Sequence, residues 1–276
     1  MWVFNSLFGK LFDGIFFFFL NMSPWVSMIV VSLLTGMLML SIFRLTSNQE
    51  GIKKAKNKIK AHILELRLFQ DNLGISLRSQ GKILTTNLKY LSHTAKPMLI
   101  MIVPLVLVLI QLNFRFAYLP FQTGQQALVK VILKPDLNPS ETAVELTPLS
   151  AGIVVETPGI RIDEEREIDW RIRITGEGRH EFAIESGGEK VIKRIDAGGK
   201  SLRTLSPIKV GAGFLDQLFY PAEKPMASTL PFQSVTITYP ERKMNLFGWK
   251  MHWIIAYFFL SMVFGFGLKG VFKVDF

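Results

Sequence analysis

Three long apolar runs constrain the fold of this chain more than any other feature of its sequence. They cover residues 24–45, 97–118 and 247–268. Each run has about 20 residues, which is the length that an α-helix needs to cross about 30 Å of hydrocarbon. The sequence therefore predicts an α-helical membrane protein with three transmembrane helices at these positions.

The charges of the connecting segments predict how these helices are oriented. Residues 46–96 hold ten basic and three acidic side chains, and a short loop with such a surplus stays on the cytoplasmic side. Residues 119–246 hold 16 basic and 17 acidic side chains and are long enough to be translocated whatever their charge. We therefore expect an inner-membrane protein, with residues 46–96 and the tail 269–276 in the cytoplasm and with the N-terminus and residues 119–246 outside.

Composition narrows the classes of function. A net charge of +10 is typical of nucleic-acid binding in a soluble protein, but here most of the surplus lies beside a predicted membrane span, which indicates anionic lipid or ribosomal RNA and not DNA. The chain has no cysteine, its four histidines are far apart, and it has no P-loop, nucleophile elbow or dinucleotide-binding fingerprint. The carboxylates of residues 163–167 are typical of a solvated loop. We predict neither an enzyme nor a bound metal or cofactor.

Residues 1–23 form an apolar, aromatic segment that contains Lys10 and Asp13. It lacks the basic start and the small-residue cleavage site of a signal peptide, so we expect it to be retained. Two structures remain open for it. An amphipathic helix lying in the membrane interface keeps both charges in water, and we favour it; an additional span would bury both charges at a few kcal/mol each.

The basic segment at residues 46–96 has the pattern of a helical hairpin. Good helix formers and apolar stripes lie on both sides of a turn signal at residues 71–74, which predicts two antiparallel helices, the second ending before Pro97. The hairpin either packs its apolar stripes on itself, which composition favours, or forms a mobile basic arm that meets nascent chains or ribosomes. Its basic patch consists of Lys53, Lys54, Lys56, Lys58 and Lys60.

Residues 119–246 show short alternating runs broken by Gly and Pro, which predicts an inserted all-β, sandwich-like extracytoplasmic domain. Apolar side chains at the even positions of residues 168–174 indicate a strand with one wet face. We expect residues 168–195 to form a three-stranded antiparallel meander, the glycine pairs at 187–188 and 198–199 to form hairpin turns, and residues 213–220 to form one or two helical turns. The predicted strands are 126–133, 152–155, 168–175, 180–184, 190–195 and 234–239.

The order of these parts resembles the YidC/Oxa membrane insertase superfamily, and within it the small branch of archaeal YidC-like proteins and the third subunit of the ER membrane protein complex. The likeness rests on Thr46-Ser47-Asn48-Gln49, the lysine-rich start of the hairpin, Lys96-Pro97-Met98, and residues 253–269. It covers residues 1–118 and 247–273. One departure is the β-domain between the second and third spans, where small members of the family have a short connection.

The resemblance implies a protein that helps to insert or assemble membrane proteins through a polar, water-accessible groove in the membrane, without a cofactor. Moving a charged group from water to the middle of a bilayer costs several kcal/mol. A polar groove lowers this free energy. The candidate groove residues are Ser32, Thr35, Ser41, Arg44, Gln111, Asn113 and Ser261.

Each group of groove candidates has a simpler interpretation. The hydroxyl residues also suit helix packing in lipid, Arg44 also suits snorkelling to phosphates, and Arg115, which follows the outer pair Gln111 and Asn113, also suits anchoring at the interface. The alternative function is a non-catalytic structural subunit of a larger envelope complex, with the β-domain binding the partner. Membrane lipids and other membrane or envelope proteins are the expected partners in either case.

Overall fold

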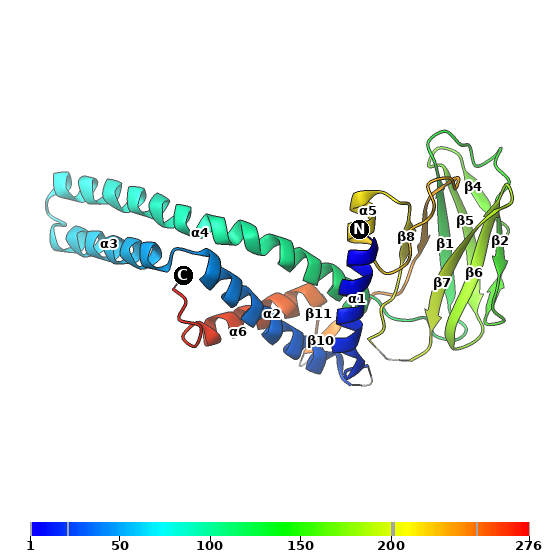
Figure 1. The fold of residues 1–276 in the computed structure, drawn as a ribbon, viewed down its shortest axis with the longest axis horizontal. Helices are drawn as coiled ribbons and strands as arrows, with labels where there is room; N and C mark the ends of the chain where they lie inside the picture. The colour runs from blue at the N-terminus through cyan, green and yellow to red at the C-terminus, as the bar shows by residue number, and fades with distance from the viewer. Residues whose placement is uncertain (1, 21, 200–201, 247, 276) are drawn as a thin grey trace. The chain divides into compact units, whose positions relative to one another are not determined.

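The computed structural model describes residues 2–20, 22–199, 202–246 and 248–275, and it combines helices with β-sheets, as the sequence predicts (Figure 1). The helices are α1 (Trp2–Phe17), α2 (Pro24–Thr46), α3 (Gln49–Leu68), α4 (Leu73–Phe116), α5 (Phe214–Phe219) and α6 (Trp253–Leu268). The strands are β1 (Gln126–Leu133), β2 (Glu145–Pro148), β3 (Ile153–Val155), β4 (Ile160–Ile162), β5 (Glu167–Ile174), β6 (Gly178–Ser186), β7 (Glu189–Ala197), β8 (Ile208–Val210), β9 (Phe232–Ile237), β10 (Met244–Leu246) and β11 (Trp249–Met251).

The chain divides into two compact units. The first, which we call the sandwich unit, consists of Met1–Ser27 and Leu109–Trp253. The second, which we call the helical unit, consists of Met28–Val108 and Ile254–Phe276. Helix α1 and the last turns of α4 thus belong to the same unit as the β-sheets.

Two of the described helices, α2 and α4, are long and apolar enough to cross a membrane. Helix α4 has 44 residues, which corresponds to about 66 Å, about twice the hydrocarbon thickness of a bilayer. Contrary to prediction, the second hairpin helix does not end before Pro97 but continues without a break through Pro97 and Pro104. A proline inside a helix removes one backbone donor, so α4 lacks one such donor at each of the two positions.

The third predicted span differs more from the structure. Helix α6 begins at Trp253 and has 16 residues, so it is about 24 Å long. The predicted start, Phe247, lies outside the described residues, and Trp249–Met251 forms a strand that pairs with β10. A run as short as residues 249–251 can adopt either conformation, and its strand form depends on the pairing with β10.

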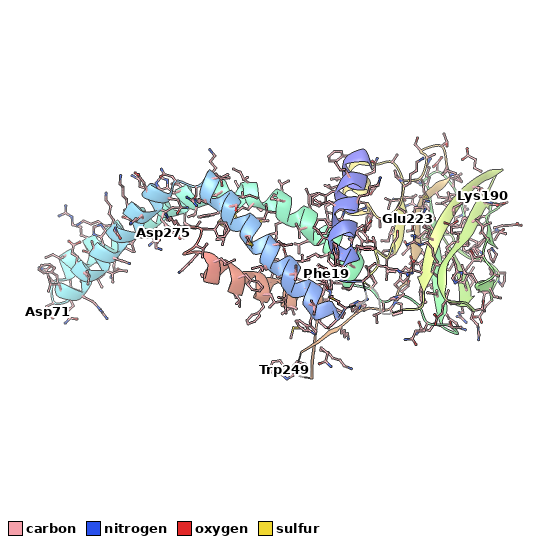
Figure 2. All side chains as sticks on the ribbon, turned by 60° about the horizontal axis from the view of Figure 1, so that its bottom comes forward. Phe19, Asp71, Lys190, Glu223, Trp249 and Asp275 are labelled. Carbon is pink, nitrogen blue, oxygen red and sulfur yellow. The ribbon has the colours of Figure 1, made fainter. Side chains whose placement is uncertain are left out.

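The hairpin of α3 and α4 has its predicted antiparallel form, with Asp71 near its tip (Figure 2). Asn48 caps α3, since its side chain accepts a hydrogen bond from the backbone N–H of Gly51 at 2.9 Å. Near the tip, Lys82 of α4 pairs with Glu65 of α3 at 3.3 Å. Hydrogen bonding with His62, followed by the contact with Lys82, lowers the pKa of Glu65.

Two antiparallel sheets form the sandwich. One has six strands in the order β3-β5-β1-β9-β8, with β4 also pairing with β5, and the other has three strands in the order β2-β6-β7. The apolar side chains at the even positions of residues 168–174 are buried in the core, as predicted from their alternation. Side chains of both sheets share this core, including Val129 and Ile172 from the first and Phe182 and Ile195 from the second.

The predicted meander is wrong, because β5 pairs with β1, β3 and β4, whereas β6 and β7 pair in the other sheet. The turn after β5 therefore carries the chain from one sheet to the other. Gly187 and Gly188 do form a hairpin turn, with φ of 59° and 81°. Gly198 and Gly199 instead follow β7 on the way to β8, which pairs only with β9 among the described strands.

Five strands were not expected: β2, β4, β8, β10 and β11. Each has only three or four residues. So short a run shows no clear period-2 pattern, and its strand conformation depends on the neighbour that it pairs with. Residues 214–219 form the short helix α5, as predicted.

Candidate functional site

A cluster of hydroxyl side chains lies between α2 and α6 in the helical unit. Ser32 and Thr35 are buried on α2, and Tyr257 is buried on α6 together with the partly buried Ser261. The hydroxyls of Ser32, Tyr257 and Ser261 are buried and have no hydrogen-bond partner in the part of the chain that the structure describes. The Tyr257 hydroxyl faces Thr35 and Ser261 without reaching hydrogen-bond geometry with either. We call these four residues the hydroxyl cluster.

Close packing of α2 on α6 brings the cluster together. A Cβ atom on Gly36 of α2 would lie 3.4 Å from the Cβ atom of Phe264 and 3.7 Å from the backbone nitrogen of Gly265. Small residues allow such close approach of membrane helices. Further along both segments, the backbone N–H of Asp275 donates to Gln49 at 2.8 Å, so α2 and α6 run in the same direction.

The hydroxyl cluster contains three of the seven predicted groove residues. Tyr257 was missed because an aromatic residue within an apolar run signals no polar role. The signal that could have found it is the i, i+4 spacing of Tyr257 and Ser261, which puts two hydroxyls on one face of a helix. On α2, Ser32, Thr35 and Gly36 share a face in the same way.

Two further predicted groove residues lie outside the cluster. The Ser41 hydroxyl donates to the carbonyl oxygen of Met37 in its own helix at 2.8 Å, and Arg44 is exposed in the last turn of α2. Neither contributes to the hydroxyl cluster.

The outer pair, Gln111 and Asn113, lies in the sandwich unit. Gln111 is buried and accepts a hydrogen bond from Arg115 at 3.2 Å, and Asn113 borders a cavity of about 260 Å³. Arg115, expected at the interface as an anchor, is instead 1% exposed and forms an ion pair with Asp13 of α1. Its guanidinium also lies 5.0 Å from the ring centre of Phe16.

The basic patch lies on α3, the first helix of the hairpin. Lys53, Lys54, Lys58 and Lys60 are exposed, and Lys56 is partly buried. A cavity of about 670 Å³ between α3 and α4 is lined by Lys54, Lys58 and Lys89 together with neutral side chains and one carboxylate. The remaining lining residues are Asn48, Glu50, Gly51, Ala55, Asn57, Thr85, Thr86 and His93.

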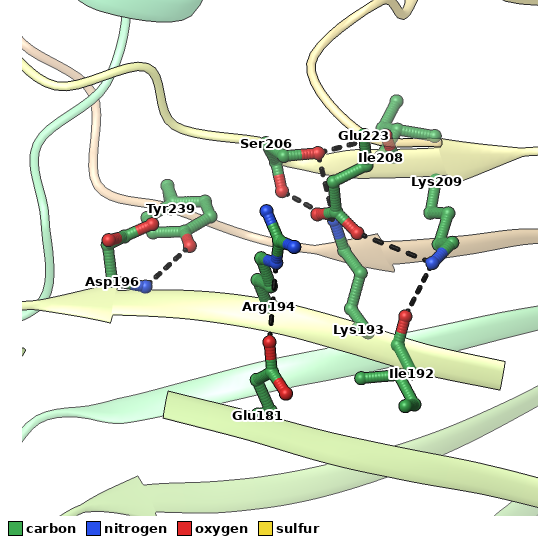
Figure 3. Close-up of polar contacts among 10 residues, drawn as sticks. All are labelled: Glu181, Ile192, Lys193, Arg194, Asp196, Ser206, Ile208, Lys209, Glu223 and Tyr239. Atoms are coloured by element: carbon green, nitrogen blue, oxygen red, sulfur yellow. Dashed lines mark hydrogen bonds and ion pairs between the residues drawn. The ribbon is translucent and has the colours of Figure 1, made fainter. Parts of the chain in front are cut away.

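A buried polar network, absent from the sequence prediction, lies in the sandwich unit (Figure 3). The ammonium group of Lys193 on β7 is fully buried and donates to the Glu223 carboxylate at 2.6 Å and to the carbonyl and hydroxyl oxygens of Ser206 at 2.6 and 3.1 Å. These bonds use all three donors of the ammonium group. Lys209 lies 3.7 Å from the second Glu223 oxygen and donates to the carbonyl of Ile192 at 2.6 Å.

The partners in this network all lie inside the sandwich unit. Burial lowers the pKa of Lys193, whereas Glu223 opposes that shift. The Ser206 hydroxyl donates to the carbonyl of Ile208 at 3.3 Å, so it is oriented away from the role of a nucleophile. The network thereby joins β7 to the segments before β8 and after α5. Lys193 could have been noticed from the sequence, because it falls at the core-facing position between Val191 and Ile195.

A second polar group lies on β5 and yields a testable pH dependence. One Asp169 carboxylate oxygen is buried, with no hydrogen-bond partner within residues 2–20, 22–199, 202–246 and 248–275, and Glu167 on the same strand pairs with Lys130 at 2.7 Å. Burial, with a smaller contribution from the charge of Glu167, raises the pKa of Asp169 from 3.8 to about 6. The folded protein therefore retains, between about pH 4 and 6, a proton that the unfolded chain releases.

We expect this proton to stabilise the sandwich unit as the pH falls through 6. Lowering the pH from 7.5 to 5 should raise the contribution of Asp169 to the free energy of unfolding by about 1 kcal/mol, after allowance for solvent screening. Asp169→Asn should abolish this contribution, which is measured as the difference between the pH slopes of thermal unfolding of the two proteins. Equal slopes would contradict the assignment.

Comparisons with known proteins add little to this geometry. No family model matches the chain, and no curated protein matches it significantly. A structure of domains 4 and 5 of the S-layer protein SbsC aligns at 23% identity over 30% of this chain and 48% of that chain, with a TM-score of 0.24. A structure of SbsC domains 1–6 aligns at 26% identity over 30% of this chain and 12% of that chain, with the same TM-score. The chain thus spans about half or less of these structures, and likeness at this level supports no statement about fold or function.

Proposed function

We propose that this chain is an inner-membrane protein that assists the insertion or assembly of other membrane proteins, with the hydroxyl cluster as the polar contact for the substrate. The observation that carries the proposal is the set of three buried hydroxyls, those of Ser32, Tyr257 and Ser261, for which the described residues offer no hydrogen-bond partner. An unpaired polar group in an apolar environment is unfavourable by about 1–3 kcal/mol. A polar segment that enters between α2 and α6 would satisfy these groups.

The length of α6 supports the same proposal. At about 24 Å, the helix is shorter than the roughly 30 Å core of an ordinary bilayer. A short apolar helix favours local thinning of the membrane, which shortens the path of a polar segment. The resemblance to the YidC/Oxa superfamily, argued above from the order of the spans and the hairpin, points to the same class of function.

Within this proposal, the basic hairpin lies in the cytoplasm and the sandwich unit outside. The surplus of seven positive charges in residues 46–96 supports this orientation. The parallel direction of α2 and α6 agrees with it, because both helices then run from outside to inside. The lysine-lined cavity between α3 and α4 would be available to nascent chains or ribosomes.

Removal of the unpaired hydroxyls tests the proposal. We expect Ser32→Ala, Tyr257→Phe and Ser261→Ala, combined in one chain, to slow insertion about tenfold, because hydrogen bonds in a membrane contribute about 0.6–2 kcal/mol each. The measurement is insertion of a small membrane protein with a short translocated tail into proteoliposomes that contain the full chain. Since the replaced groups have no hydrogen-bond partner among the described residues, the variant should be at least as stable as the original chain.

The matched control is Ser41→Ala, which removes a hydroxyl of α2 that already bonds to Met37. It should leave insertion unchanged. Full activity of the triple variant would exclude the hydroxyl cluster as the substrate contact.

The second candidate is a structural subunit of an envelope complex. The sandwich unit includes α1 and the end of α4, which favours this candidate. The backbone N–H of Leu205 donates to the carbonyl of Phe114 at 2.8 Å, and the Thr204 hydroxyl donates to the Asp13 carboxylate at 3.2 Å. Such bonds make the membrane segments an anchor for a rigid β-domain. Unchanged insertion by membranes that lack the chain would favour this candidate.

A further inference from the structure

A small basic cavity lies in the sandwich unit beside the first residue of α6. Its volume is about 260 Å³, just below the roughly 300 Å³ at which pockets for drug-sized ligands begin, so it suits a small group. Three cationic side chains and one carboxylate line it. The lining residues are Asn113, Ala117, Tyr118, Glu241, Arg242, Lys243, Lys250, Met251 and His252.

Arg242 is the residue of this lining that is both charged and buried. The residue is 7% exposed, its backbone N–H donates to the carbonyl of Ala117 at 2.8 Å, and its Nε donates to the carbonyl of Tyr118 at 3.2 Å. Its Nη2 is buried and has no hydrogen-bond partner among the described residues. A buried guanidinium donor without an acceptor is unfavourable, and an oxyanion is the acceptor that matches its planar geometry.

The surroundings add positive potential at the same place. Lys243 and Lys250 are exposed on the rim, where their ammonium groups can reach an anion from the solvent side. Helix α6 begins at Trp253, directly after the lining residue His252, and the N-terminus of a helix attracts negative charge. Glu241, the one acidic residue of the lining, is exposed.

The hairpin of β10 and β11 indicates where the anion comes from. Trp249, at the turn end of this hairpin, is 79% exposed (Figure 2), and Lys250 follows it. A tryptophan with an adjacent lysine is typical of the headgroup layer of a membrane. The apolar helix α6 starts four residues after Trp249, which fits a cavity at the level of lipid phosphates.

We propose that this cavity binds the phosphate group of an anionic phospholipid, with Arg242 as the buried ligand and Lys243 and Lys250 closing it from the rim. The bound lipid would hold the start of α6 at the membrane surface. This site is independent of the hydroxyl cluster and stands whether or not the chain inserts other proteins.

Binding of defined lipids to the full chain in detergent tests the proposal. We expect short-chain phosphatidylglycerol to bind in titration calorimetry, and we expect Arg242→Gln and Lys250→Gln each to weaken its binding at least fivefold. Lys250 is exposed, so its replacement reports on the site even if Arg242→Gln unfolds the protein. Phosphatidylcholine, whose headgroup has no net charge, should bind more weakly than phosphatidylglycerol.

The matched control is Arg203→Gln. Arg242 also borders a larger cavity of about 1370 Å³, and the exposed Arg203 lines only that one. Arg203→Gln should leave the affinity unchanged. Equal binding of inorganic phosphate and phosphatidylglycerol, both weakened by Lys250→Gln, would uphold the phosphate site but identify its source as the free anion. Absence of binding, or binding insensitive to Lys250→Gln, would overturn the proposal.

Discussion

Glu223→Ala is expected to lower the free energy of unfolding of the sandwich unit by about 3–5 kcal/mol. Lys193, which is 0% exposed, would keep its two bonds to Ser206 but lose the bond to the Glu223 carboxylate. Removal of one partner of a buried ion pair leaves a charge that water cannot reach. Chemical denaturation of the full chain in detergent, followed by near-UV circular dichroism, measures the loss.

Two further variants separate this explanation from a general effect of truncation. Lys193→Met combined with Glu223→Leu removes both charges and should recover most of the stability, since buried ion pairs can often be replaced by apolar side chains. Glu185→Ala breaks the exposed pair of Glu185 with Lys190, 3.2 Å apart, and should change the free energy by less than about 1 kcal/mol. A large loss in the double variant would contradict the buried-charge explanation.

The same change should make stability depend on alkaline pH. Burial lowers the pKa of Lys193 in the folded protein, so the unfolded chain binds more protons than the folded one up to the ordinary lysine value of about 10.4. Stability therefore rises with pH in this range. Without Glu223, which favours the charged form, the pKa of Lys193 should fall further, and the rise should begin at a lower pH.

Asp13→Ala is expected to release α1 from the end of α4. Arg115 is 1% exposed, and the Asp13 carboxylate joins it to α1 and accepts the hydrogen bond of Thr204. Because Asp13 is 64% exposed and Gln111 still accepts from Arg115, we expect a loss of about 2 kcal/mol, below that of a fully buried pair. Amide hydrogen exchange in α1 should accelerate about 30-fold, since 1.4 kcal/mol corresponds to a factor of ten.

Lys10→Ala is the control for this prediction. Lys10 is exposed on the same helix, so its replacement removes a charge without touching the ion pair. It should leave exchange in α1 unchanged. Equal acceleration in both variants would show that the charge of α1, and not the contact between Asp13 and Arg115, holds the helix.

Local patterns in the sequence predicted the elements more reliably than their pairing. The alternation of residues 168–174 identified β5 and its buried face, and the turn signal at residues 71–74 identified the hairpin of α3 and α4. Hydrophobic periodicity is a property of adjacent residues, so it can be read without knowing the fold. The partner of β5 depends on β1, some 40 residues earlier, and the meander was predicted from adjacency alone.

The candidate sites show the same division. Ser32, Thr35 and Ser261 could be named from their chemistry, since hydroxyls stand out in apolar runs, but their meeting with Tyr257 depends on the contact of Gly36 with Phe264 and Gly265. The network of Lys193 joins residues that are 13 and 30 positions apart, and no spacing rule relates them. Contacts between side chains that are distant in the sequence produce no periodic pattern along it.

Hydropathy and charge act between neighbours along the chain. They therefore sufficed to locate the apolar segments, the basic hairpin and the longer strands within residues 126–239. Tertiary contacts were needed to reveal the two sheets, the unbroken course of α4 through Pro97, the short α6, and the burial of Lys193, Arg115 and Arg242. Burial and pairing require surfaces that distant segments offer one another, and these surfaces exist only once the chain has folded.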